Sequence, residues 1–305
     1  MMKKIISVVV FIISITATGF SQESTFYLFF VNIISEPFRF PLIGLVNIAN
    51  GNHDKVQLGL VNWNTGNFTG LQAGLANSAG GNISGVQLGL VNTSAGNING
   101  WQSGLVNTVA NGGQGFQFGL VNASMEKLKG VQLGLINYVE SIEDGVPIGL
   151  ISIVKNGGYR AVEYSFSEFY PTTIGLKLGV EKFYSTIFCA YSPSSEFDSN
   201  DLAIGSGFGS IISISETFFF NPELNFMSST IWTILNGNTQ NFISFIPYFG
   251  YKINKNFCIT LGPSLTWING DNGSLKKPLF KISHHKINEN NSLITGVRAS
   301  FRLAF

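Results

Sequence analysis

Eight glycines recur at a constant interval of fifteen residues in the first half of this chain, and a leucine directly follows each of them. No insertion or deletion interrupts the interval, which indicates that one short unit has been copied in tandem. A unit this short cannot bury its apolar side chains alone, so its copies must stack on one another. We therefore expect an elongated repeat structure over residues 40–158. The glycines are Gly44, Gly59, Gly74, Gly89, Gly104, Gly119, Gly134 and Gly149.

Each copy has the pattern of a short β-strand followed by a turn. In one copy, Val86, Leu88 and Leu90 alternate with Gln87 and Gly89, which predicts a strand whose apolar face is buried. The density of glycine excludes a helix. After the turn, a single apolar residue recurs and is expected to enter the same core from a second short strand. This residue is Phe68, Ile83, Ile98 and Leu128 in four of the copies, with Ile142 as a further candidate.

The recurrent glycine and asparagine are assigned structural roles. We expect the glycine where backbones pack closely or where a Cβ would not fit. We expect the asparagine in a turn, or in a ladder of stacked amides that also includes the recurrent glutamine. The asparagines in question are Asn62, Asn77, Asn92, Asn107, Asn122 and Asn137.

Two architectures can use this repeat. Each copy could form one coil of a β-solenoid, in which identical residues stack in parallel, or one strand of a single large antiparallel barrel. Pairing the apolar faces in the antiparallel arrangement leaves no net stagger between strands, whereas a closed barrel needs strands tilted by about 35–45°. We therefore prefer the solenoid and keep the large barrel as the alternative.

The N-terminal residues have the features of a secretory signal peptide. Two lysines precede an apolar run over residues 5–15, and a cleavage site with small residues ends at Ser21. The apolar run is too short to span a membrane, for which about 20 residues are needed. We expect residues 1–21 to be removed on export and residues 22–39 to form a lead-in strand.

After Gly158 the fifteen-residue period ends and longer strands begin, so residues 159–305 form a separate domain. Apolar residues alternate with glycine and charged residues, as around Lys177 and Arg302. Apolar side chains outward and charged ones inward are typical of lipid-facing barrel strands, although a soluble β-sandwich or barrel has the same alternation. The segments are 159–168, 172–181, 183–192, 201–215, 216–228, 241–253, 256–269 and 296–305, which predicts an antiparallel barrel of about eight strands. A polar loop is expected at 269–291.

Composition and motifs argue against several function classes. Charged residues make up 11% of the chain and the net charge is +1, so nucleic acid is not expected as a partner. No catalytic motif, cofactor motif or metal-spaced set is present, and the pair His284-His285 has no third ligand nearby. We expect neither an enzyme nor a cofactor. Export would allow a disulfide between Cys189 and Cys258, but both lie in strand-like apolar segments, so we prefer buried free thiols and keep the disulfide as the alternative.

The tandem G-V-Q-L-G-L-V-N copies, ending in G-V-P-I-G-L-I-S over residues 145–152, resemble an uncharacterised family of bacterial surface-repeat proteins. The resemblance covers residues 40–160 and implies export to the outer membrane or cell surface, but no activity. The terminal Phe305, preceded by alternating apolar residues, resembles the C-terminal insertion signal of outer-membrane barrel proteins. A looser likeness links the repeat to the head repeats of trimeric autotransporter adhesins, whose own signature is absent.

These features predict a structural or interaction protein of a Gram-negative outer membrane or cell surface. In this adhesin-like interpretation the repeats display uncharged Gln, Asn and Thr to a surface ligand or carbohydrate, while outer-membrane lipid surrounds the barrel. The alternative is a small outer-membrane channel or transport component.

Overall fold

A computed structural model describes residues 26–305 apart from 28–29, 36–37, 194–200, 230–238 and 271–274. The expected signal peptide lies outside the described residues. Over the described part of the chain the structure consists of strands and turns without a helix. It divides into two compact units, residues 1–119 and 120–305.

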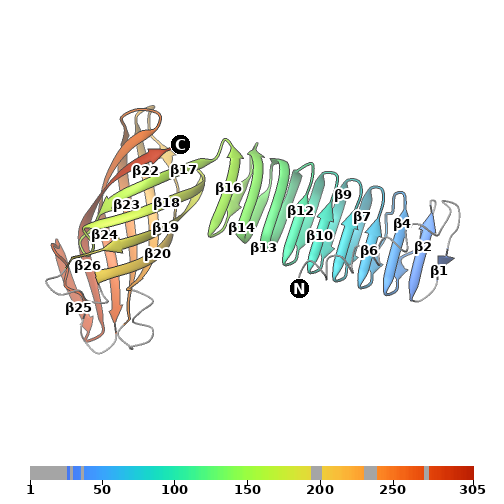
Figure 1. Ribbon diagram of the computed structural model, residues 1–305, viewed down its shortest axis with the longest axis horizontal. Coiled ribbons are helices and arrows are strands. Elements are labelled where there is room, and N and C mark those ends of the chain that lie inside the picture. The colour runs from blue at the N-terminus through green and yellow to red at the C-terminus, as the bar shows by residue number, and fades with distance from the viewer. Residues whose placement is uncertain (1–25, 28–29, 36–37, 194–200, 230–238, 271–274) are drawn as a thin grey trace. The chain divides into compact units, whose positions relative to one another are not determined.

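The first unit is a parallel β-solenoid (Figure 1), as predicted. Strands of successive coils pair in parallel at a spacing of one repeat, so that Asn92 pairs with Asn107 and Gln87 with Gln102. This pairing rules out the large antiparallel barrel. One sheet contains β2 (Val31–Ser35), β4 (Val46–Asn50), β6 (Val61–Asn64), β8 (Ala76–Ala79), β10 (Val91–Ser94) and β12 (Val106–Val109). The other contains β3 (Leu42–Ile43), β5 (Gln57–Leu58), β7 (Phe68–Ala73), β9 (Ile83–Leu88), β11 (Ile98–Ser103) and β13 (Gly113–Leu128).

The parallel stack begins before residue 40. Strand β2 pairs in parallel with β4, and Asn32 lies opposite Asn47 in the same register as the later coils. Strand β1 (Phe26–Tyr27) pairs with β2 in the antiparallel direction. Part of the segment expected as a lead-in strand is therefore already a coil of the solenoid.

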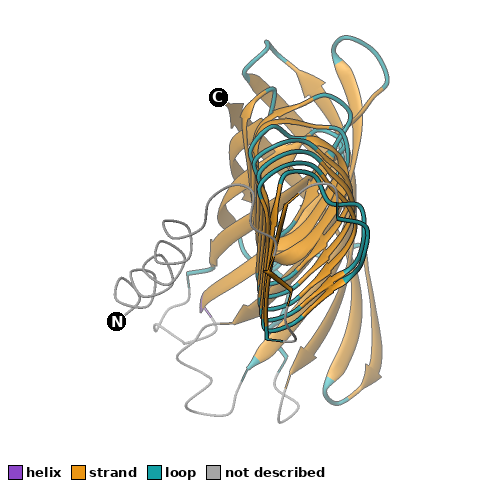
Figure 2. Ribbon diagram, turned by 90° about the vertical axis from the view of Figure 1, so that its right-hand side faces the viewer, coloured by secondary structure: helices purple, strands orange, loops and turns teal. Residues whose placement is uncertain are grey.

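The buried face of each coil is the opposite of the one expected from the alternation. Gln87 and Asn92 are fully buried, whereas Leu88 and Leu90 are 42% and 48% exposed. The reversal has a physical reason, because stacking places identical amides one above another, where each can hydrogen-bond to the next and lose little by leaving water. Figure 2 shows the coils as nested, flattened loops.

A small apolar core lies beside the amides. Phe68, Ile83 and Ile98 stack in one column, with Ala79 and Val109 packed against them. This confirms the expectation that the residue after the turn enters the interior. Ile142, the further candidate, packs against a related cluster around Leu128.

The second unit starts with the last coils and continues into a barrel. Strand β14 (Val131–Ile142) pairs in parallel with β15 (Val146–Ile148) and β16 (Ile151–Asn156). Within this unit Val180, at the end of β18, packs against Val139 and Val154 of the last coils. The solenoid core is thereby covered at this end, as a repeat stack requires of its cap.

The barrel is antiparallel and closed, as predicted, because its last strand pairs with its first through Glu163 and Arg302. The eight strands of the ring are β17 (Tyr159–Phe166), β18 (Thr172–Val180), β19 (Phe183–Tyr191), β20 (Leu202–Gly209), β22 (Phe218–Ser229), β23 (Gln240–Lys252), β24 (Phe257–Gly270) and β26 (Asn291–Ala304). A two-residue strand, β21 (Ile212–Ser213), pairs with β22.

Two local expectations about the barrel are wrong. The region expected to be a polar loop contains β25 (Ser283–Asn288), which pairs with β26 where β17 has ended, so His284 and His285 lie on a strand. The cysteines are free, but Cys189 is exposed and Cys258 is partly exposed. The strand β25 was not expected because all six of its residues are exposed, so it lacks the alternation that marks a strand with one buried face. The error about the cysteines arises because alternation alone does not show which positions of a strand face inward.

Candidate functional site

The recurrent glycines lie at a sharp corner of each coil. A Cβ added to Gly104 would lie within 3.0 Å of the carbonyl oxygen of Gly89 in the preceding coil and 2.7 Å from the amide nitrogen of Asn92. The corner is therefore open only to a residue without a side chain. The same crowding is found at Gly59, Gly74, Gly89 and Gly149; Gly44 and Gly134 supply the carbonyls beneath Gly59 and Gly149, and Gly119 lies within β13.

The recurrent asparagines form a buried ladder that also holds these corners. The Nδ2 of Asn92 donates to the Oδ1 of Asn107 at 2.8 Å and to the carbonyl of Ser103, just before the next corner, at 2.9 Å. The first unit contains Asn32, Asn47, Asn62, Asn77, Asn92 and Asn107 in this ladder, and the second contains Asn122 bonded to Asn137.

The glutamines form a second ladder on the other sheet. Gln102 donates from Nε2 to the Oε1 of Gln87 at 2.7 Å, and Gln87 donates in the same way to Gln72. Each of these nitrogens also donates to a backbone carbonyl of its own coil, as Gln87 does to Thr93 at 3.2 Å. The amides expected to be displayed to a ligand are thus enclosed in the solenoid.

Leucines occupy the exposed side of the corners instead. Successive leucines stack through backbone hydrogen bonds, such as the one from the Leu105 nitrogen to the Leu90 oxygen at 2.9 Å. We call the exposed leucines that follow the recurrent glycines of the first unit the leucine stripe; they are Leu45, Leu60, Leu75, Leu90 and Leu105, between 48% and 52% exposed, flanked by the exposed Ile43, Leu58 and Leu88. In the second unit Leu120 and Leu135 are similarly exposed. The largest apolar patch of a typical monomer is about 300–600 Å² and is often functional.

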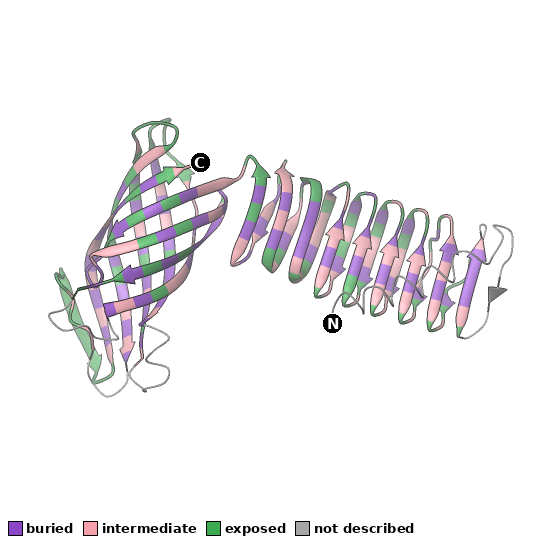
Figure 3. Cartoon of the chain, viewed as in Figure 1, coloured by how far each residue is buried: buried purple, intermediate pink, exposed green. Residues whose placement is uncertain are grey.

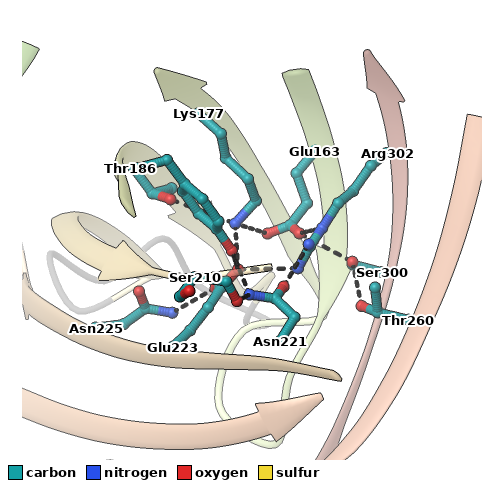
Figure 4. A network of polar contacts seen from close by, with 11 residues as sticks. Glu163, Lys177, Thr186, Ser210, Asn221, Glu223, Asn225, Thr260, Ser300 and Arg302 are labelled. Carbon is teal, nitrogen blue, oxygen red and sulfur yellow. Dashed lines mark hydrogen bonds and ion pairs between the residues drawn. The ribbon is translucent and has the colours of Figure 1, made fainter. Parts of the chain in front are cut away.

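The barrel interior holds a buried network of charges (Figure 4). Lys177, fully buried on β18, contacts the carboxylate of Glu223 at 2.6 Å and that of Glu163 at 3.2 Å. Arg302 contacts the same two carboxylates, with its Nη2 2.9 Å from Glu223. Two cations therefore face two carboxylates, and Tyr184 adds a hydrogen bond to Glu223.

A second buried ion pair lies nearer the end of the barrel at which β17 ends and β18 begins. The connection between β17 and β18 folds inward, so that Glu168, Phe169 and Tyr170 are fully buried. Glu168 accepts a hydrogen bond from Thr266 at 2.6 Å and pairs with Arg298 at 3.4 Å. The interior charges thus balance in pairs, and side chains fill the lumen, as expected for a barrel of about eight strands.

The outer face of the barrel is apolar. Figure 3 shows buried and exposed residues alternating along its strands. Leu176 and Leu303 point outward and are 38% and 53% exposed, whereas Lys177 and Arg302 point inward, as the alternation predicted. Phe305 ends the chain next to β17, where its nitrogen donates to the Arg160 carbonyl at 3.1 Å.

Reactive groups are scattered over the described residues. No group of three or more His, Cys, Asp or Glu side chains in this part of the chain could hold a metal ion. The acidic residues Glu140 and Asp144 pair with Lys155 and Lys182 at 2.7 and 2.9 Å on the surface. The leucine stripe and the pairing of the buried charges with one another are the features that sequence reasoning missed; the invariant leucine after each glycine was the available signal for the stripe.

Comparisons with family models, with curated proteins and with solved structures found no match to this chain. Within the described residues, helices long and apolar enough for a membrane span are absent.

Proposed function

We propose that this chain is an outer-membrane interaction protein, in which the barrel is the anchor and the solenoid presents the leucine stripe to a partner. The proposal keeps the resemblance to exported surface-repeat proteins and assigns no catalytic activity. The observation that carries it is the pairing of an apolar barrel exterior with a charged but internally neutralised interior. Such an arrangement is stable where the surroundings of the barrel are lipid.

The leucine stripe supports a binding role for the repeats. Exposed leucines at every corner lower solubility and add nothing to the solenoid core, so a purely structural stack would not require them. Because the amides are enclosed, apolar contact replaces the hydrogen bonding to a carbohydrate that the sequence suggested.

The lengths of the barrel connections favour one side of the membrane for the repeats. At the end where β17 begins, two residues separate β18 from β19, four separate β23 from β24, and eight, which include β21, separate β20 from β22. At the opposite end, five residues separate β17 from β18, ten separate β19 from β20, ten separate β22 from β23, and twenty, which include β25, separate β24 from β26. Outer-membrane barrels have short turns on the periplasmic side and longer extracellular loops. We therefore place the repeats, which lead directly into β17, in the periplasm, so an adhesin-like role towards an extracellular ligand is the less favoured form of the proposal.

Labelling of single cysteines in whole cells tests this placement. In a Cys189→Ala/Cys258→Ala background, His285→Cys should react with a membrane-impermeant maleimide on intact cells, and Asn97→Cys only after the outer membrane is permeabilised. Labelling of Asn97→Cys on intact cells would place the repeats outside. Recovery of the mature chain in the soluble fraction without detergent would exclude the membrane anchor.

A photo-crosslinking residue tests the binding role of the stripe. Placed at Leu90 it should give a discrete adduct in cells, whereas at Asn97, in the turn of the same coil, it should not. Equal adducts at both positions, or none, would contradict a partner bound through the leucines.

A small channel remains the second candidate because the ring is closed. The side chains of Lys177, Tyr184 and Arg302 fill its cross-section, and all three are almost completely buried. We therefore expect no steady conductance when the purified protein is inserted in a planar bilayer. Reproducible single-channel steps that change with Lys177→Met would favour the channel.

A further inference from the structure

A cavity of about 470 Å³ lies at the long-loop end of the barrel, and nothing above assigns a role to it. Its volume falls within the range of about 300–1,000 Å³ that is usual for small-molecule sites. Its floor is apolar, since Ile268 and Ile294 belong to the buried cluster at this end of the lumen and Leu275 packs against that cluster.

The wall of this cavity is basic. Lys277 and Lys281 line it, and β25 contributes His284 and Lys286. In the register of β25 with β26, His284 lies opposite Ile294 and Lys286 opposite Ser292, two positions that face inward. Opposed residues of an antiparallel pair share a face of the sheet, so these two side chains point towards the cavity. His284 is held there by a 3.1 Å hydrogen bond between its Nε2 and the Ser292 Oγ.

Carboxylates do not neutralise this basic wall. Glu289 is the acidic residue among those that line the cavity. Within the described part of the chain, Lys277, Lys281 and Lys286 have no carboxylate oxygen within 4.0 Å. The short-turn end differs, because Lys182 and Lys252 there contact Asp144 and Glu181 at 2.9 and 3.9 Å.

Lys276 has a different role from the other lysines. Its Nζ lies 3.7 Å from the carboxylate of Asp201 and 4.9 Å from the centre of the Tyr170 ring. These contacts fix the segment that carries Lys277 against the barrel mouth. The cavity is therefore bounded by an anchored wall and by the strand β25.

We propose that this cavity binds an anionic amphiphile, a molecule with a phosphate or carboxylate group and an alkyl chain. The anionic group meets the lysines, and the alkyl chain covers the partly exposed Leu275 and Pro278 next to the buried Ile268 and Ile294. An inorganic anion would leave the partly exposed Leu275 and Pro278 in contact with water, and a neutral amphiphile would leave the lysines without a counter-charge, so neither satisfies both parts of the site. The inference does not depend on a partner of the leucine stripe.

Binding of octyl phosphate to the purified full chain in a neutral detergent tests the proposal. Isothermal titration should show saturable binding of octyl phosphate and of octanoate. Inorganic phosphate and octyl glucoside should each bind at least tenfold more weakly. Binding of inorganic phosphate as tight as that of octyl phosphate would overturn the apolar part of the site, and equal binding of octyl glucoside would overturn the basic part.

Two matched variants locate the site. Lys281→Gln/Lys286→Gln should weaken octyl phosphate at least tenfold, whereas Lys127→Gln/Lys255→Gln, which removes the same charge from two exposed lysines elsewhere, should leave it unchanged. Leu275→Ser should weaken octyl phosphate but not inorganic phosphate. An equal loss of affinity for octyl phosphate in both double variants would show that net charge alone attracts the ligand, and would refute the site.

The source of the ligand is tested by reconstitution in nanodiscs of phosphatidylcholine with or without phosphatidylglycerol. Retention of phosphatidylglycerol in native mass spectra, lost in Lys281→Gln/Lys286→Gln, identifies a lipid headgroup as the ligand. Binding of octyl phosphate without retained lipid identifies a free amphiphile. Absence of both in a folded protein would overturn the proposal.

Discussion

The amide nitrogen of Asn92 occupies the space that a side chain at Gly104 would need, lying 2.7 Å from the position of the missing Cβ. From there it donates to the carbonyl of Ser103 and so ties one coil to the next. The glycine and asparagine of the repeat therefore form one contact between neighbouring coils, in which the glycine leaves the space that the asparagine amide occupies.

Replacement of Gly104 by valine should disrupt this contact between the coils. The new Cβ would meet the Gly89 carbonyl and the Asn92 amide, and neither backbone nor ladder can move without disturbing other coils. We expect a loss of more than about 2 kcal/mol in the free energy of unfolding, measured by urea denaturation with circular dichroism. Leu105→Val, at the adjacent exposed position, should change stability little. An unchanged midpoint for Gly104→Val would remove the close-packing argument.

The inverted burial of the repeat can be tested by exchanging residue types. Gln87→Leu leaves the Oε1 of Gln72 and an N–H of Gln102 without their partners in the ladder. Each buried group left unpaired should lower the free energy of unfolding by about 1–3 kcal/mol. Leu90→Gln should be tolerated because this side chain is about half exposed. Greater damage from Leu90→Gln than from Gln87→Leu in the same denaturation assay would mean that the leucines are inside.

His53 predicts a pH dependence for the first coils. It pairs with Phe68 at the start of the apolar column, and burial lowers its pKa, an effect that nearby Asp54 only partly offsets. The unfolded chain, with a histidine pKa of about 6.5, therefore binds the proton more tightly than the folded chain. The contribution of neutral His53 to the free energy of unfolding should be fully present above a pH of about 6.5. This contribution should be lost as the pH falls through that value towards the lowered pKa of the folded state. His53→Phe should remove this component of the pH profile, and identical profiles for both proteins would contradict the explanation.

The outer face of the barrel should not accept charge. Leu176→Arg would place a cation among lipid tails, which destabilises the inserted barrel by about 2–4 kcal/mol when the position is near the midplane. We therefore expect the folded, membrane-inserted form to be lost from the membrane fraction of cells. Gly179→Arg is unsuitable as an inward control, because Gly179 has a φ of 145° and its Cβ would lie 2.6 Å from the Phe183 carbonyl. Ile253→Arg, in a short turn, is the better control and should insert normally. Equal insertion of both variants would argue against a lipid-embedded barrel.

The buried charges should behave as one unit. Lys177→Met removes one of two cations that face Glu163 and Glu223, and an uncompensated buried charge costs about 3–5 kcal/mol. Glu223→Gln added to Lys177→Met restores neutrality and should recover part of this loss. Urea denaturation in detergent gives the coupling energy through a double-mutant cycle. Additive effects of the two substitutions would contradict the network, and Lys182→Met, in an exposed ion pair, serves as the control.

Much of the architecture could be predicted from the sequence because it depends on periodicity. The fifteen-residue interval of Gly89 and Gly104 predicted parallel coils, and the two-residue alternation around Lys177 predicted barrel strands with charges inside. In both cases a local pattern determines the structure, since a strand directs alternate side chains to opposite faces whatever surrounds it.

The tertiary structure alone decided which face of each coil is buried and which groups meet. The alternation that includes Gln87 and Leu90 fits burial of either face of the strand. Which face is buried depends on whether the amides find partners in the coils above and below. The contact of Lys177 with Glu223, and the basic wall that β25 adds to the barrel mouth, also join residues far apart in the chain. Hydrogen bonds and charge pairs between such residues exist only after the chain has stacked or closed, so no pattern along the sequence contains them.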